Sequence, residues 1–108
     1  MNVLKIKGNN YPLKFSINAM IEFEELSGKS FSQIGDNMSL ANIRLLFYVG
    51  LKAGGNDVNE LQAGMLMNDY VEDNGMEKFG EILSKSAVEA LGKNKAKPPE
   101  KKQGRVTR

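Results

Sequence analysis

Residues 40–53 read LANIRLLFYVGLKA and restrict the fold more than any other segment of the chain. Apolar residues recur there at helical spacing, Ser39 stands in the N-cap position, and Gly54-Gly55 ends the pattern. A helix that is apolar on nearly all sides must occupy the centre of a core or be covered in part by a partner molecule. Its broad apolar face comprises Leu40, Ile43, Leu46, Phe47 and Leu51, widened by Leu45, Tyr48 and Val49.

Other segments also carry helix boundaries. Ser16 caps a predicted helix from Ile17 to Ser27, and Gly28 can take the left-handed conformation that ends it. A Ser-x-x-Gln pattern at 30–33 predicts a single helical turn, which Gly35 ends before a turn at 36–37. An Asp-x-x-Glu pattern at 57–60 opens a helix that ends near Asn68, with a short continuation at 70–71 closed by Asn74-Gly75. The last helix is predicted from Met76 to about Leu91, and Gly92 ends it.

Residues 3–15 have the pattern of a β-hairpin. Leu4 and Ile6 alternate with polar residues, and Gly8-Asn9-Asn10 is predicted to be the turn. Pro12 lacks an amide proton, so the returning strand must lie at a sheet edge. A lone hairpin is marginally stable in water, so a helix must cover its apolar face.

These patterns predict an α+β fold that is mostly α, with an N-terminal β-hairpin packed on a small bundle of about four helices. Residues 1–92 form the helical domain, and residues 93–108 form a basic, disordered tail. To Gly92 the chain has eight Lys and Arg against twelve Asp and Glu, whereas the tail has seven against Glu100 alone. An acidic body therefore carries a basic tail.

Composition argues against catalysis. The chain contains no histidine and no cysteine, so the usual nucleophile–base sets cannot be built. The glycine turns lack the Lys-Ser/Thr of a phosphate loop. A weak site for a divalent ion is one alternative, formed by Asp69, Glu72 and Asp73. An acidic helix face of this kind is, however, usually only solvated surface. We expect no enzyme activity, no cofactor and no metal.

The location of the protein is also constrained. The N-terminus MNVLKIKGNN lacks the apolar region of a secretory signal. No run of residues approaches the length needed to span a bilayer. We therefore expect a soluble protein that stays inside the cell that makes it and has no membrane partner.

The segment YPLKFSINAMIEFEELSGKSFSQIG, residues 11–35, resembles the tail assembly chaperones of long-tailed (siphovirus-type) bacteriophages. Many of these proteins open with a hairpin of the pattern N-G-x-x-Y-x-L-x-F, followed by a-L-x-x-F-E-x-x-T/S-G-K-S. The match covers about a quarter of the chain. The matching residues are Asn10, Tyr11, Leu13, Phe15, Phe23, Glu24, Ser27, Gly28, Lys29 and Ser30.

The resemblance implies a non-catalytic protein that coats the tape-measure protein before and during tail assembly. It also implies a role in recruiting the tail-tube protein, in the host cytoplasm, and absence from the mature virion. Many members of the family exist in a short form and in a form extended by a programmed ribosomal frameshift. The basic, proline-containing end of this chain suits such a boundary.

A chaperone for an apolar, helical client needs an adaptable hydrophobic surface. Four residues are predicted to contribute to it: Leu45, Tyr48, Val49 and Met67. The first three widen the apolar helix over residues 40–53. Met67 is included because Met65 and Met67, two positions apart on a helix, cannot both face inward.

Two other functions are alternatives: a structural protein of the virion, such as a head–tail connector subunit, and a small regulatory protein that binds nucleic acid through its tail. The tail has no aromatic residue for base stacking, so such binding would be unspecific. The Lys and Arg residues of the predicted helices stand singly among acidic residues, whereas a DNA-recognition helix carries several of them on one face. Docking of the tail on the acidic body of a neighbouring copy, in a homo-oligomer, and a merely solvated tail are the remaining interpretations.

Overall fold

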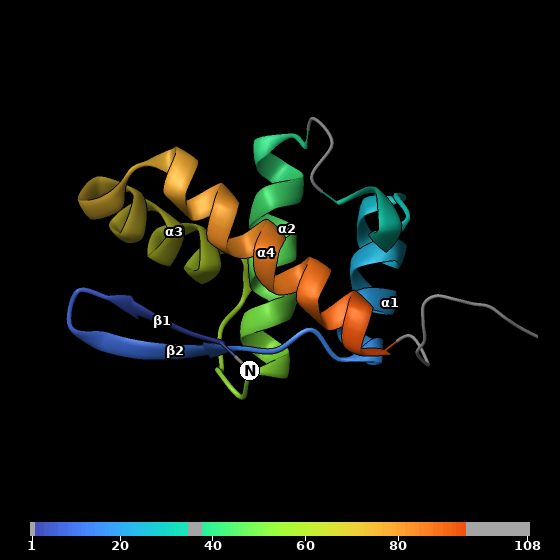
Figure 1. Cartoon of the computed structure of the whole chain (residues 1–108). Coiled ribbons are helices and arrows are strands. Elements are labelled where there is room, and N and C mark those ends of the chain that lie inside the picture. Colours follow the sequence, from blue (N-terminus) through green and yellow to red (C-terminus); the bar gives the residue numbers. More distant parts are fainter. Residues whose placement is uncertain (1, 35–37, 95–108) are drawn as a thin grey trace, which may run out of the picture.

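Helix α2 runs through the middle of the protein, and the other elements surround it (Figure 1). The computed structural model describes residues 2–34 and 38–94, except for the side chains of residues 93 and 94. A hairpin and four helices are present, as predicted. The elements are β1 (Asn2–Ile6), β2 (Asn9–Leu13), α1 (Ile17–Ser27), the 3-10 helix η1 (Phe31–Gln33), α2 (Leu40–Ala53), α3 (Glu60–Asn74) and α4 (Met76–Asn94).

Most of the apolar surface of α2 is covered by the chain itself. Phe47, Val49 and Leu51 are completely buried. The Phe47 ring meets the Phe79 ring of α4 edge-on at 5.0 Å between centroids, and the Phe79 ring lies 5.6 Å from Tyr70 of α3. Edge-to-face packing suits the charge distribution of aromatic rings. This aromatic cluster joins the three C-terminal helices, so α2 is the centre of the core.

The hairpin is antiparallel, with Leu4 opposite Tyr11. Its turn differs from the prediction, because Asn9 and Asn10 already belong to β2 and the turn is Lys7-Gly8. Both turn residues have positive φ, 50° and 84°, as expected for a two-residue turn whose twist matches the strands. Asn2 Nδ2 donates a 2.6 Å hydrogen bond to the buried Ser86 Oγ, which ties β1 to α4.

The segment that carries the family resemblance is built from structural contacts. The Phe31 ring lies 6.0 Å from both the Phe15 ring and the Phe23 ring, and all three are buried. Glu24 Oε2 accepts a 2.7 Å hydrogen bond from the Phe31 backbone N–H, and Gly28 ends α1 with φ of 75°. These contacts fix the turn after α1.

Three predicted boundaries are wrong. The capping box of α3 is formed by Asn59 and Gln62, with two reciprocal bonds of 2.8 Å, and not by Asp57 and Glu60. Helix α3 then continues unbroken to Asn74, because its second half is held against α4 through Tyr70. Helix α4 passes through Gly92 to Asn94, since glycine tolerates a helical conformation at a cost of about 1 kcal/mol.

Some predictions concern parts of the chain that the structure does not describe. The turn at 36–37 and the role of Gly35 lie outside the described residues. The same holds for the predicted disorder of the basic tail from residue 95 onward.

The hairpin lies against the C-terminal end of α2 with almost no space between the two backbones. A Cβ atom placed on Gly54 would lie 2.1 Å from the carbonyl oxygen of Pro12. The same oxygen accepts a 2.8 Å hydrogen bond from Asn56 Nδ2, and Gly50 O accepts one of 3.1 Å from Lys14 N. Glycine is required at position 54 for steric reasons, because any side chain would collide with the Pro12 carbonyl group. Its backbone conformation is not the reason, since a φ of −77° is accessible to every residue.

We predict that Gly54→Ala lowers the free energy of unfolding by about 2–3 kcal/mol, because backbone must shift to remove the clash. Urea denaturation monitored by circular dichroism measures the change. Gly80→Ala is the control, because nothing lies within 4 Å of its added Cβ. It should gain about 0.5–1 kcal/mol from helix propensity. Equal effects of the two substitutions would contradict the proposed contact.

A second prediction concerns pH. Burial raises the pKa of the Tyr70 hydroxyl above its usual value. The unfolded chain therefore loses this proton at lower pH than the folded protein, so the stability contribution of Tyr70 is present below about pH 10 and is lost above it. We expect Tyr70→Phe to lose less stability than the wild type between about pH 9 and pH 11 in urea titrations. An identical loss in both proteins would refute this assignment.

Candidate partner-binding groove

The four residues predicted to form a client-binding surface do not form one. Leu45 and Val49 are only 6% and 0% exposed, so both belong to the core. Tyr48 is half-buried, and Met67 is partly buried against the core cluster. The expectation that these residues share an exposed face is therefore corrected.

Helix α1 explains this correction. Lys52 Nζ lies 4.9 Å from the centre of the Tyr48 ring and 2.8 Å from Glu22 Oε2 of α1. The pKa of Lys52 is raised above its usual value, mainly by its hydrogen bond to Glu22 and, to a smaller extent, by its hydrogen bond to Tyr48. The side of α2 that carries Tyr48 thus faces α1. The excess apolar surface of this helix is used within the fold.

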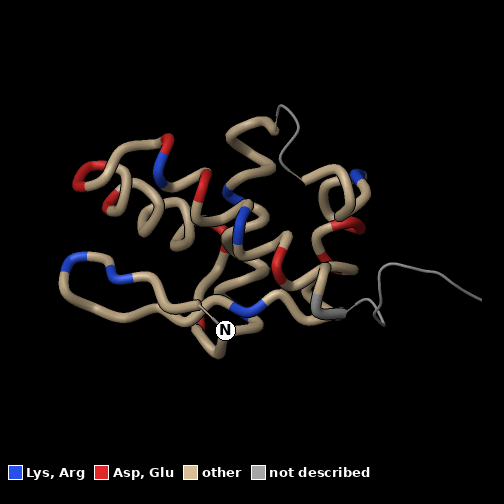
Figure 2. Tube along the Cα trace, viewed as in Figure 1, with Lys and Arg blue, Asp and Glu red and all other residues tan. Residues whose placement is uncertain are grey.

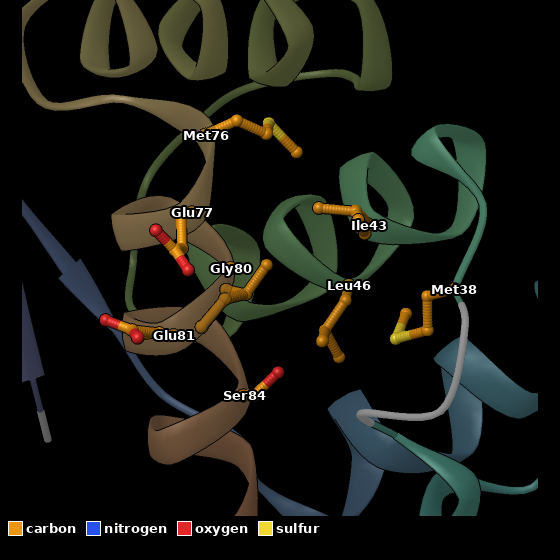
Figure 3. A pocket seen from close by; sticks show the side chains of 9 residues that line it. Met38, Ile43, Leu46, Met76, Glu77, Gly80, Glu81 and Ser84 are labelled. Carbon is orange, nitrogen blue, oxygen red and sulfur yellow. The ribbon is translucent and has the colours of Figure 1, made fainter.

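An apolar groove opens instead between the first half of α2 and the first half of α4 (Figure 3). Its volume is about 220 Å³. Sites for small molecules usually measure about 300–1,000 Å³, so this groove suits an inserted side chain better than a whole metabolite. The lining residues are Met38, Ile43, Leu46, Met76, Glu77, Gly80, Glu81, Leu83 and Ser84.

The floor of the groove is rigid and its sides are adaptable. Leu46 and Leu83 are buried and belong to the core. Met38 and Met76 are partly buried, come from different parts of the chain, and extend into the groove from opposite ends (Figure 3). Methionine has an unbranched, flexible side chain that adapts to irregular apolar shapes. The groove can therefore accept apolar side chains of more than one shape.

One edge of the groove is acidic. Glu77 and Glu81 are exposed, line the groove one turn apart on α4, and carry their carboxylates on the side of α4 that is farther from Ile43 and Leu46 (Figure 3). No salt bridge joins either of them to a cation among the described residues. A partner that places Lys or Arg beside its apolar side chain would complement this edge.

Gly80 keeps the groove open. It lies between the two glutamates on α4, and a Cβ atom built on it meets nothing within 4 Å. Because Gly80 lines the groove and its added Cβ meets no described atom within 4 Å, a larger side chain there has open space at the wall of the groove. The sequence offered one signal for this, a glycine in the middle of a predicted helix.

The acidic cluster on α3 has a different role. Lys7 Nζ, at the tip of the hairpin, lies 3.3 Å from Asp73 Oδ1 and 3.6 Å from Glu72 Oε1. Figure 2 shows these charges at the hairpin tip and on the neighbouring helix. The hydrogen bond to Asp73 is the main cause that raises the pKa of Lys7. Over residues 2–34 and 38–94, no three acidic side chains converge in a way that could hold a metal ion.

The groove offers mainly apolar contact surface. Among the described residues its polar side chains are the exposed carboxylates of Glu77 and Glu81 and the Ser84 hydroxyl. Within the described part of the chain, each helix is too short or too polar to cross a membrane. Comparisons of the chain with protein-family models, with curated proteins and with solved structures return no match.

Proposed function

We propose that this protein is a non-catalytic tail assembly chaperone of a long-tailed bacteriophage that binds the tape-measure protein through the groove between α2 and α4. The observation that carries the proposal is the groove itself, with its core-supported floor, two methionines and open position at Gly80. The resemblance of residues 11–35 to that family supplies the identity of the client. Helices with an apolar face bind in grooves of this kind.

The groove also specifies the chemistry of the client segment. A helix with an apolar side chain that enters beside Leu46 and Leu83 would bury that side chain against the core. Its flanking positions would carry Lys or Arg, because Glu77 and Glu81 line the edge. While the tail is assembled, binding in the groove shields the apolar side chain of this tape-measure segment from solvent. The tail-tube protein is the second partner, and the protein acts in the host cytoplasm without entering the mature virion.

The first test fills the groove. We predict that Gly80→Leu lowers the amount of tape-measure protein that co-purifies by about tenfold, which corresponds to about 1.4 kcal/mol of binding free energy. Gly92→Leu is a matched control. It lies on the same helix, receives the same side chain, and is exposed outside the groove, with no described atom within 4 Å of its added Cβ.

Circular dichroism confirms that both variants are folded before co-purification is compared. Equal capture of the tape-measure protein by Gly80→Leu and Gly92→Leu would reject the groove as the binding site. Failure of the wild-type protein to capture any tape-measure segment would reject the function.

The second test reverses the charge of the edge. We predict that Glu77→Lys combined with Glu81→Lys weakens binding of the tape-measure protein at least about tenfold, because cations would then oppose the cations of the client. Glu89→Lys is the single-charge control on the same helix and lies outside the groove. A fluorescence titration at low and high salt measures both the affinity and its dependence on charge. Unchanged affinity in the double variant would show that the client is not cationic.

The two alternative functions give different results. Mass spectrometry of purified particles detects a structural virion protein and misses a chaperone. A mobility shift on duplex DNA, with and without residues 93–108, detects a nucleic-acid-binding tail. Among the described residues, Lys7, Arg44 and Lys52 lie within 4.0 Å of an acidic side chain, so these three cations are already paired within the protein.

A further inference from the structure

A second surface lies on α3, on a part of the molecule that the groove does not include. Leu61 and Met65 are 69% and 61% exposed and stand one turn apart. The Arg44 side chain of α2 lies beside them, with its Cδ atom 3.0 Å from the position of a Cβ on Gly64. Together with Asn68 and Asp69 these residues line a shallow depression, which we call the α3 face.

The α3 face contains an incompletely bonded cation. Within the part of the chain that the structure describes, Arg44 Nε is buried and finds no hydrogen-bond acceptor. Its Nη2 lies 3.9 Å from Glu60 Oε2, too far for a hydrogen bond. Because the Arg44 side chain is 40% exposed and its Nη2 is not hydrogen-bonded to Glu60, the Nη groups can donate hydrogen bonds to a better-placed carboxylate of another molecule.

The charges of this face identify its partner. Arg44 lies beside Gly64 on one side of Met65, and Asp69 lies one turn beyond Met65 on the other side. A two-fold axis near Met65 would bring two α3 helices together in opposite directions, with Arg44 of each copy facing Asp69 of the other. The face carries both signs of charge, Arg44 at the end nearer Glu60 and Asp69 at the other, so a two-fold arrangement can pair opposite charges. The edge of the groove carries acids alone and would repel its own copy.

We propose that the α3 face is a self-association surface through which two copies of this chain form a dimer. Met65 of each copy packs near the axis, and Leu61 of each copy flanks it. One helix pair buries less area than a standard interface, so the dimer is weak, with a dissociation constant in about the micromolar to millimolar range. This inference does not depend on the proposed client, because it concerns the protein alone.

The absence of cysteine from the sequence allows a direct test. Met65→Cys and Val88→Cys each introduce one thiol, at positions that are 61% and 60% exposed. Under mild oxidation we expect Met65→Cys to form a disulfide-linked dimer about tenfold faster than Val88→Cys, because association raises the local concentration of the paired thiols. Non-reducing gel electrophoresis measures both rates. Equal rates would overturn the proposal.

Sedimentation equilibrium on the full, cysteine-free chain tests the same surface without a cross-link. The average mass should rise from 11.9 kDa towards twice that value as the concentration approaches about 1 mM. Leu61→Ser and Asp69→Arg should each weaken association about tenfold while circular dichroism shows a folded protein. Gly80→Leu should associate like the wild type. A mass that stays at 11.9 kDa over the whole range would refute the dimer.

Discussion

Burial of α2 is the constraint on which the rest of the structure depends. A helix with apolar residues on nearly every side must be surrounded, and α1, α3, α4 and β2 each cover part of it. The hairpin can approach only because Gly54 has no side chain to meet Pro12 O. Helix α4 approaches through the Phe47–Phe79 contact. The groove lies where this coverage stops, which is why its floor is continuous with the core.

Sequence patterns predicted the elements well because most of their signals are local. Ser16 and Ser39 cap their helices with side-chain bonds of 3.2 Å and 3.1 Å to the backbone, as their positions indicated. The capping box of α3 was misassigned because two overlapping patterns compete there, and the Asn56 contact with the hairpin lies outside any local pattern. The candidate site was not predictable in the same way. Its residues come from two segments some forty positions apart in the sequence. Val49 is buried and Met65 is exposed, and this difference depends on tertiary packing that a local pattern does not contain.

The two proposed surfaces differ in the signs of their charged side chains. Glu77 and Glu81 give the edge of the groove a single sign, which disfavours acidic partners and the same edge of a second copy. Arg44 and Asp69 give the α3 face both signs, which favours its own copy over a uniformly basic client. The residues that line the groove and those that line the α3 face do not overlap, so the two proposals can be tested with separate sets of substitutions.

The hydrogen bond between Asn2 and Ser86 joins residues 84 positions apart and has a consequence for folding during translation. At about 5–20 residues per second, the ribosome needs about 4–17 s to make the partner of the first strand after the strand itself. During that interval Leu4 and Ile6, which are buried in the finished protein, lack the later helices of the fold, among them α3, which contacts β1. The strand β1 is therefore made 84 positions before the residue that ties it to α4, and its enclosure must wait until that later segment has been synthesised.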